Sequence, residues 1–305
     1  DKVHRPASTG IDWAAPPRPL RAVLDTSIVK IAGLWATWLA IAIFYCIARW
    51  DWSGNYRFSM DLFLNAAPWL LAASVPYILW IDRRLIEPRD ATYSFGQWVI
   101  GGAAGAPDMS EVANHARAWA VKGFFLAFMI SIVPGNFASV VEWRISDAVA
   151  HPVALAGFLI AVMFMVDVCM ATVGYILTFK PLDSHIRTAN PYLGGWLAAL
   201  ICYPPFVLMG KGGPLDYHAG GAEWDVWTQG STVLQWLLGG WLVLLTAVYA
   251  WATVAFGIRF SNLTYRGVIT NGPYRYTRHP AYLSKNAFWW FCYMPFLVTS
   301  DTMTD

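Results

Sequence analysis

The sequence predicts an all-α protein, a polytopic bundle of about seven transmembrane helices with a cytoplasmic N-terminus. Three observations carry this prediction: an apolar composition, a series of long apolar runs, and an uneven distribution of basic residues. Hydrophobic residues make up 57% of the 305 residues and charged residues only 13%, whereas a soluble domain carries about 25% charged residues. The 18 tryptophans belong to a residue type that favours membrane interfaces.

The apolar runs define the expected spans, because a bilayer core is crossed by about 20 consecutive apolar residues. The runs cover residues 28–48, 62–81, 118–134, 152–179, 193–209, 232–256 and 281–299. The third and the last are short, and the fourth is long enough to tilt. We therefore divide the chain into a cytoplasmic segment (1–27), a six-span membrane region (28–256) and a C-terminal part (257–305).

The positions of the basic residues predict which segments lie on the cytoplasmic side of the membrane. With the N-terminus in the cytoplasm, all but four of the 21 lysine and arginine residues fall in or next to cytoplasmic segments. The exceptions are Arg49, Arg57, Arg144 and Lys211. Because cytoplasmic loops carry an excess of Lys and Arg, this asymmetry favours an N-in topology with an odd number of spans.

The segments between the spans exclude several functions. The longest hydrophilic stretch, residues 82–117, contains a glycine cluster at 101–105 but no Gly-Lys-Ser/Thr, so it is not a phosphate-binding loop. Residues 211–231 read as an external loop. The scattered basic residues form no nucleic-acid patch. No loop is long enough for a soluble catalytic domain, so any chemistry is expected at the membrane.

Metal and disulfide chemistry are not expected. The four cysteines, Cys46, Cys169, Cys202 and Cys292, form no C-x-x-C pair and lie in or beside apolar runs. We interpret them as small buried hydrophobic residues. The histidines His115, His151 and His218 have no partners at metal-ligand spacing, and we predict that no metal is bound.

The stretch before the last span is the most informative part of the chain. Asn271-Gly272-Pro273 is a turn signal, and Pro280 suits the first turn of a helix, so we expect the last helix to begin at Pro280. Arg275, Arg278 and His279 would then precede a helix N-terminus, where partial positive charge attracts anions. Arginine and tyrosine also serve as ordinary membrane-interface residues, and this alternative stays open.

Residues 272–283, Gly-Pro-Tyr-Arg-Tyr-Thr-Arg-His-Pro-Ala-Tyr-Leu, resemble the signature of the isoprenylcysteine carboxyl methyltransferase family, which is related to membrane phospholipid methyltransferases. The resemblance covers about thirty residues, and the family pattern G-x-Y-R-x-x-R-H-P-x-Y is filled at nearly every fixed position. It implies an integral membrane methyltransferase that uses S-adenosylmethionine, with a prenylated or lipid-like acceptor at the cytoplasmic face.

The resemblance also implies roles for individual residues. It places His279, Pro280, Tyr282 and Gly272 at the cofactor, and it gives Arg275 and Arg278 catalytic positions, where they hold anionic groups of the cofactor or substrate. Two features depart from the family. Ser284 stands where the family usually has glycine. The family also has a further C-terminal cytoplasmic segment that completes its site, whereas this sequence stops at Asp305.

These departures favour a second hypothesis, a non-catalytic subunit of a larger membrane complex that retains the methyltransferase-like fold. A relative of the sterol reductases, with a nicotinamide cofactor, is a third. The expected partners are membrane lipids, a lipid-like or prenylated substrate and other subunits, but no nucleic acid. Arginine is used more often than lysine, as in GC-rich bacterial genomes, so we expect a multi-pass protein of the bacterial inner membrane.

Three further parts of the sequence lead to expectations. Asp167 lies in the middle of the fourth expected span, where an ionisable residue is either functional or a hydrogen-bonded link between helices. His185 and Arg187 follow that span, either beside His279 or in a solvated loop. The chain begins at Asp1 rather than methionine and stops at Asp305, so we expect that the natural chain continues beyond both ends.

Overall fold

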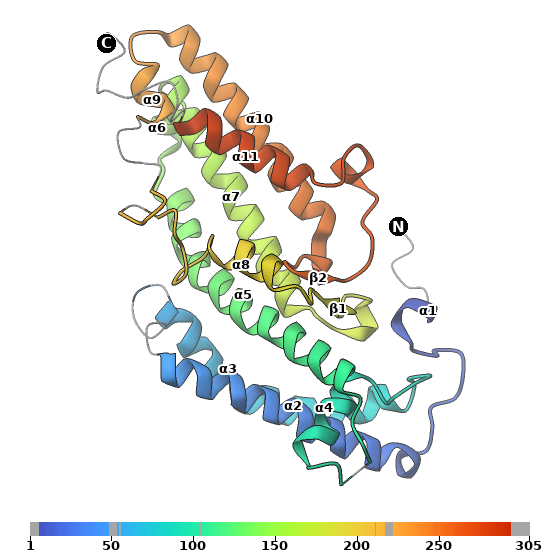
Figure 1. The fold of residues 1–305 in the computed structure, drawn as a ribbon. Helices are drawn as coiled ribbons and strands as arrows, with labels where there is room; N and C mark the ends of the chain where they lie inside the picture. The colour runs from blue at the N-terminus through green and yellow to red at the C-terminus, as the bar shows by residue number, and fades with distance from the viewer. Residues whose placement is uncertain are drawn as a thin grey trace. The chain divides into compact units, whose positions relative to one another are not determined.

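The fold is described from a computed structural model, drawn in Figure 1. The structure describes residues 6–48, 54, 56–103, 105–210, 212–216 and 222–293. Within these ranges the chain is mostly helical, and the two strands form one short antiparallel pair. The α-helices are α1 (Pro6–Thr9), α2 (Leu20–Ala48), α3 (Tyr56–Asp82), α4 (Ala91–Val99), α5 (Met109–Val141), α6 (Ile145–Ala148), α7 (Pro152–Ile176), α8 (Leu193–Leu200), α9 (Trp224–Trp227), α10 (Thr232–Phe256) and α11 (Pro280–Tyr293).

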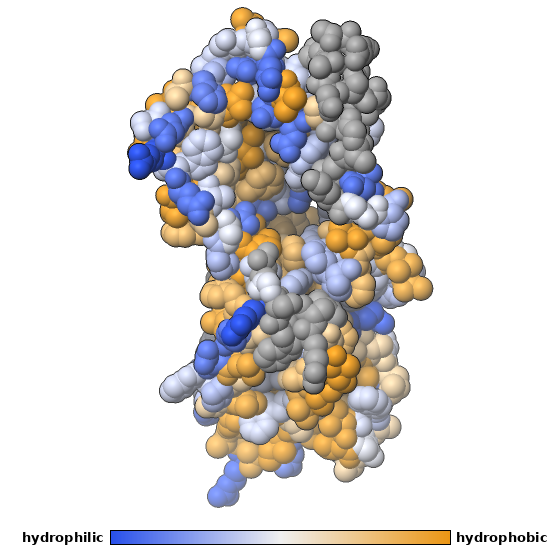
Figure 2. Space-filling model, turned by 90° about the vertical axis from the view of Figure 1, so that its left-hand side faces the viewer, coloured by the Kyte–Doolittle hydropathy of each residue, from blue (hydrophilic) through white to orange (hydrophobic). Residues whose placement is uncertain are grey.

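Five helices among the described residues are long and apolar enough to cross a membrane: α2, α3, α5, α7 and α10 with the turn that follows it. They support the prediction of a helical membrane protein with several spans. Many large hydrophobic side chains on these helices are exposed, among them Leu39, Trp69 and Leu237, and Figure 2 shows hydrophobic residues over much of the face in view. Lipid would cover such a surface on a membrane protein.

Two of the seven expected spans are not helices of membrane length within the described residues. Residues 193–209 contain only α8, which has 8 residues and spans about 12 Å at 1.5 Å per residue. Turns follow it up to Pro204-Pro205, where two residues without a backbone N–H cannot continue a helix. The last helix, α11, has 14 residues, and residues 294–299 of the predicted span lie outside the described ranges.

The third expected span is longer than predicted. Helix α5 has 33 residues and includes Pro134 in its interior, whereas the sequence analysis ended the span there. The stretch 82–117, expected to be a loop, contains the nine-residue α4 and the first two turns of α5. Helix α4 packs so closely on α2 that a Cβ on Gly96 would lie 2.1 Å from the Val29 carbonyl oxygen.

The chain divides into two compact units, which are described separately. Unit 1 comprises residues 1–131, 174–191 and 261–267, and unit 2 comprises residues 132–173, 192–260 and 268–305. Helix α5 passes from the first unit into the second, and α7 passes from the second into the first.

In unit 1, the segments that follow and precede the long helices meet one another. Lys30 in the first half of α2 binds Asp82 at the end of α3, and Lys180 after α7 binds Asp90 before α4. Strand β1 (Thr188–Ala189) pairs with β2 (Thr264–Tyr265). These contacts join the segments that the charge distribution assigns to one side of the membrane.

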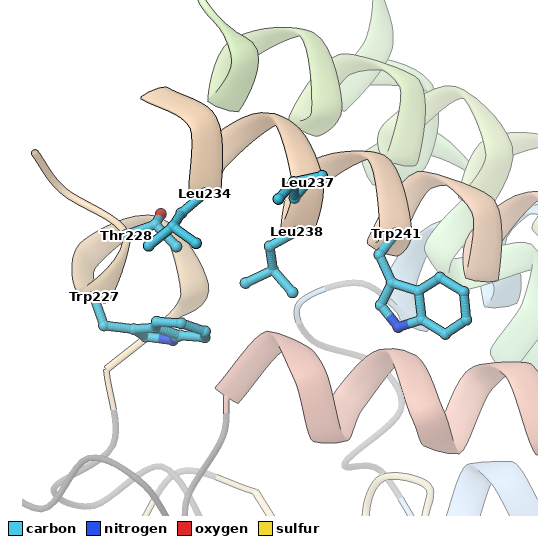
Figure 3. Close-up of a pocket in the computed structure, with 6 residues that line it drawn as sticks. All are labelled: Trp227, Thr228, Leu234, Leu237, Leu238 and Trp241. Atoms are coloured by element: carbon cyan, nitrogen blue, oxygen red, sulfur yellow. The ribbon is translucent and has the colours of Figure 1, made fainter. Parts of the chain in front are cut away.

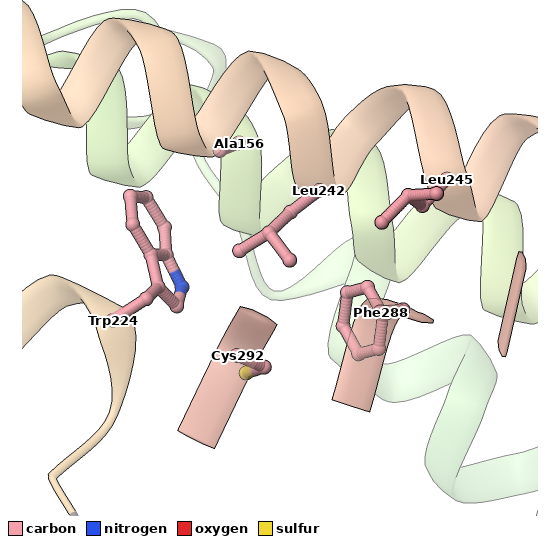
Figure 4. Packing of buried hydrophobic residues seen from close by; sticks show 6 residues of the cluster. All are labelled: Ala156, Trp224, Leu242, Leu245, Phe288 and Cys292. Atoms are coloured by element: carbon pink, nitrogen blue, oxygen red, sulfur yellow. The ribbon is translucent and has the colours of Figure 1, made fainter. Parts of the chain in front are cut away.

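In unit 2, α7 and α10 run in the same direction. Gly239 lies against Ala156 near the start of both helices, and further along each helix Asp167 is bonded to Tyr249 and Thr253. Helix α11 runs back along α10, with Phe291 against Trp241. A buried cluster joins the three helices to α9, as Figure 4 shows. Its buried residues are Ala156, Trp224, Leu242, Leu245, Phe288 and Cys292.

Candidate functional site

The candidate site is the segment from Gly272 to Tyr282, between α10 and α11 in unit 2. A four-residue 3-10 turn (η4, Gly272–Arg275) opens it, and α11 closes it. Helix α11 begins at Pro280, which confirms the start predicted from the sequence. Proline is accepted there because the first N–H of a helix has no partner within the helix.

The turn is fixed against the end of α10. Gly272 has φ +57°, and a Cβ on it would lie 2.9 Å from the Ala255 Cβ. Glycine is therefore required both by the backbone conformation and by the close approach of the two segments. Pro273 is buried beside it, and the Tyr274 ring meets the Phe256 ring edge-on at 5.0 Å between centroids.

Tyr274 is held as a neutral phenol. Burial raises the pKa of its hydroxyl above the ordinary value, and the neighbouring Tyr282 raises that pKa further. A neutral hydroxyl both donates and accepts hydrogen bonds. Tyr274 therefore brings an aromatic face and an uncharged polar group to the base of the segment.

The residues after the turn are exposed to the surroundings. Arg275, Arg278 and His279 are all exposed, and Tyr282 is 63% exposed. The ion pairs found among the described residues include neither of the two arginines. Two uncompensated guanidinium groups and an imidazole thus lie within one short segment, which suits an anionic ligand.

The N-terminus of α11 adds backbone donors. The Leu283 N–H donates to the His279 carbonyl as the first bond of the helix, so the amides of Ala281 and Tyr282 precede the bonded part of the helix. No side-chain cap for these two amides is found within the described ranges. The His279 and Tyr282 rings lie 6.0 Å apart between centroids, so a cationic, aromatic and donor-rich surface forms at this end of α11.

Ser284, which stands where the methyltransferase signature usually has glycine, does not contribute to this surface. It is buried, and its hydroxyl donates to the Pro280 carbonyl at 2.8 Å within α11. The next residue, Lys285, is partly buried and approaches Tyr249 of α10.

Asp167 forms a hydrogen-bonded link between two helices, which was one of the two alternatives predicted from the sequence. It is 6% exposed, and its two carboxylate oxygens accept hydrogen bonds from Tyr249 (2.8 Å) and Thr253 (2.5 Å) of α10. These bonds link α7 to α10, since both partners lie on the neighbouring helix.

His185 and Arg187 belong to unit 1, whereas His279 belongs to unit 2. The Arg187 guanidinium donates to Asp183 at 3.1 Å. Burial lowers the pKa of His185 to about 4, and the positive charges of Lys180 and Arg187 act in the same direction. The segment is partly buried, which differs from the solvated loop that was one of the two alternatives predicted from the sequence.

A partly buried ionic cluster in unit 1 was not predicted from the sequence. Lys30 lies 2.6 Å from Asp82 and 3.1 Å from Asp90, and Lys180 lies 2.5 Å from Asp90. Ser27 also donates to Asp82. Burial by itself would raise the pKa of Asp90, but Lys30 and Lys180 outweigh it and hold that pKa well below its usual range.

The cysteines differ from expectation. Cys292 is buried, but Cys46, Cys169 and Cys202 are exposed, so the interpretation as buried residues is wrong for three of the four. Cys46 and Cys169 lie on α2 and α7, where an exposed position of a spanning helix would face lipid. No group of His, Cys, Asp and Glu able to hold a metal ion is found in the described part of the chain.

An apolar cavity of about 260 Å³ lies in unit 2. Trp227, Thr228, Leu234, Leu237, Leu238 and Trp241 line it, as Figure 3 shows. It lies at the beginning of α10, whereas the candidate segment is fixed to the end of that helix. Fifteen residues of α-helix from Trp241 to Phe256 span about 22 Å, so the cavity is not part of the candidate site.

Comparisons with protein-family models, with curated proteins and with solved structures found no match to this chain.

Proposed function

We propose that the protein is an integral membrane methyltransferase that uses S-adenosylmethionine and acts on a prenylated or lipid-like acceptor at the cytoplasmic face. The observation that carries the proposal is the surface formed by Arg275, Arg278, His279 and Tyr282 at the N-terminus of α11. The proposal also rests on the resemblance of residues 272–283 to the methyltransferase signature.

The residues of the segment fit the chemical groups of this cofactor. Its carboxylate suits a guanidinium such as Arg278 and the free amides at the start of α11. Its adenine ring suits stacking on an aromatic side chain, for which Tyr282 and His279 are the exposed candidates. The bound cofactor would supply an electrophilic methyl group. The protein's own task is then to orient the acceptor, exclude water and hold the anionic groups.

The proposed topology is N-in with seven membrane crossings. The parallel course of α7 and α10 supports it, because residues 177–231 must then return to the side on which α7 begins. That return would include α8, which is too short to cross alone. The contacts of Lys30, Asp90 and Lys180 support a common side for the predicted cytoplasmic segments. The proposed location is the bacterial inner membrane.

Binding of S-adenosylmethionine by the protein in lipid nanodiscs, measured by isothermal titration calorimetry, tests the cofactor. We expect measurable binding, its loss in His279→Ala, and weaker binding in Arg278→Gln. Arg144→Gln is the matched control, because Arg144 is exposed at the start of α6 and makes no side-chain cap. Absence of binding by the unmodified protein would refute the cofactor proposal, and tight binding by His279→Ala would refute the role of that residue.

Transfer of a labelled methyl group tests the acceptor. A prenylated cysteine and an amine-bearing phospholipid are the two acceptors to compare, because a carboxylate nucleophile needs no general base and an amine needs one. We expect label in the prenylated or lipid fraction and its loss in Arg275→Gln. Label found only in water-soluble acceptors would contradict the proposed substrate class.

A non-catalytic role in a larger complex is the second candidate. The observation that favours it is the number of exposed aromatic residues on α10, since Trp236, Trp241 and Trp251 are each more than 40% exposed. Such side chains suit a protein partner as well as lipid. Co-purification with another membrane protein in fixed ratio, without cofactor binding, would select this role.

A further inference from the structure

A chain of three polar side chains connects α7, α10 and α11 inside unit 2. The Lys285 ammonium of α11 lies 3.4 Å from the Tyr249 hydroxyl and 5.0 Å from the centre of the Tyr249 ring. The Tyr249 hydroxyl in turn donates to Asp167 of α7 at 2.8 Å. Thr253, one turn further along α10, donates to the other carboxylate oxygen.

The three connected side chains carry one positive and one negative charge, with a hydroxyl between them. An ionised carboxylate only accepts hydrogen bonds, and an ammonium only donates them. Lys285 donates to Tyr249, and Tyr249 donates to Asp167, so one hydroxyl joins the two opposite charges. Because an isolated charge in an apolar surrounding is costly, each of the two charges stabilises the other.

The position of Lys285 gives the chain a link to the candidate site. Lys285 stands three residues after Tyr282, and residues three apart lie on the same side of a helix. Between them, buried Ser284 donates a hydrogen bond back to the Pro280 carbonyl within the same turn of α11. The contact of Lys285 with Tyr249 therefore fixes the end of α11 at which His279 and Tyr282 lie.

We propose that Lys285, Tyr249 and Asp167 are positioning residues that hold the start of α11, and with it the cofactor-binding segment, against α10 and α7. The role in cofactor binding rests on the proposed function. The mechanical part does not, since it concerns only how α11 is held. None of the three residues is assigned a contact with cofactor or substrate.

Charge removal at each end, and at both ends together, tests this arrangement in nanodiscs. The variants are Lys285→Met, Asp167→Asn, the double variant, and Lys285→Arg as the conservative substitution. Asn286→Met is the control, because Asn286 is the exposed neighbour on the same helix. The readouts are hydrogen–deuterium exchange in peptides covering residues 280–290 and the dissociation constant for S-adenosylmethionine.

We expect each single charge removal to speed exchange at the start of α11 about tenfold and to weaken cofactor binding by a similar factor, the size typical of coupled neighbours. Lys285→Arg keeps the charge and should leave both values within about threefold of the unmodified protein. The double variant should be no worse than the more affected single variant, because both substitutions break the same connection. Tyr249→Phe, which removes the middle group but no charge, should also speed exchange. It keeps the test decisive if Asp167→Asn does not fold.

Unchanged exchange in Lys285→Met, or a double variant that is worse than both single variants, would overturn the inference. The two proposals fail in distinguishable ways. If the unmodified protein binds no S-adenosylmethionine, the proposed function fails, but the exchange measurements still decide whether the three side chains hold α11.

Discussion

The Tyr249 hydroxyl on α10 donates a 2.8 Å hydrogen bond to Asp167 in the middle of α7. With Thr253 on the other carboxylate oxygen, this bond gives a buried acidic residue two donors from one neighbouring helix. The relationship fixes the rotation of α10 about its axis relative to α7, because Tyr249 and Thr253 must both face Asp167. The same face of α10 then presents Tyr249 to Lys285 of α11.

Replacement of Tyr249 by phenylalanine should lower the free energy of unfolding by about 1 kcal/mol, the size of one buried hydrogen bond within a membrane protein. The ring still packs on Phe164, 6.0 Å away between centroids, so the change isolates the hydroxyl. Unfolding in nanodiscs or mild detergent, followed by circular dichroism, measures it. Tyr276→Phe serves as control because Tyr276 is 81% exposed, and an equal loss in both variants would contradict the assignment.

Part of this arrangement could be predicted from the sequence. Asp167 stood out because an acidic residue interrupts an apolar run, and Pro280 marked a helix start because its ring fixes φ. The partners of Asp167 could not be predicted, since they lie 82 and 86 residues away. Hydropathy carries no information about which face of α10 meets α7.

Hydropathy also could not predict the ionic cluster or the break in the fifth expected span. Lys30 looked like an ordinary basic residue beside the membrane, and only the fold brings it to Asp82 and Asp90. Residues 193–209 are apolar enough to resemble a span. However, hydropathy does not register that Pro204-Pro205 prevents one continuous helix there.

Replacement of Gly272 by alanine should destabilise the protein by about 2 kcal/mol, because the residue has positive φ and its new methyl group would meet Ala255. Chemical or thermal unfolding measures the loss. Gly101→Ala is a matched control, since Gly101 also has positive φ (+69°) but has open space around it. We expect about 1 kcal/mol for that variant, the part due to φ alone. Equal losses in both would show that the contact with α10 contributes nothing.

Replacement of Asp82 by alanine should cost about 3–5 kcal/mol, because it leaves the Lys30 ammonium with half of its counter-charge in a buried site. The double variant Lys30→Met, Asp82→Leu removes both charges and should recover most of that loss. Unfolding measurements on the unmodified protein and these two variants show how much of the loss the second substitution recovers. The exposed Arg57–Asp61 pair provides the control, and Asp61→Ala should change stability by less than about 0.5 kcal/mol.

The stability of the protein should fall as the pH falls from about 6.5 to about 4, with His185 as one cause. Burial, followed by the charges of Lys180 and Arg187, lowers the pKa of His185 to about 4 in the folded protein, against an ordinary value of 6.5. Between these two values the unfolded chain binds a proton that the folded chain does not, so acid favours unfolding. Above about pH 6.5 both states carry a neutral imidazole, and this contribution no longer changes.

His185→Gln should flatten this part of the stability profile, because glutamine has a similar polar side chain that does not titrate. Unfolding midpoints at pH 5 and at pH 7.5 measure the effect, and the difference between them should be smaller in the variant than in the unmodified protein. Asp90 contributes little to the difference between the midpoints at pH 5 and pH 7.5. Its lowered pKa makes its contribution disappear only below about pH 4, where an unfolded aspartate begins to take up its proton. An unchanged difference between the two midpoints in His185→Gln would mean that the buried imidazole is not the group that senses this pH range.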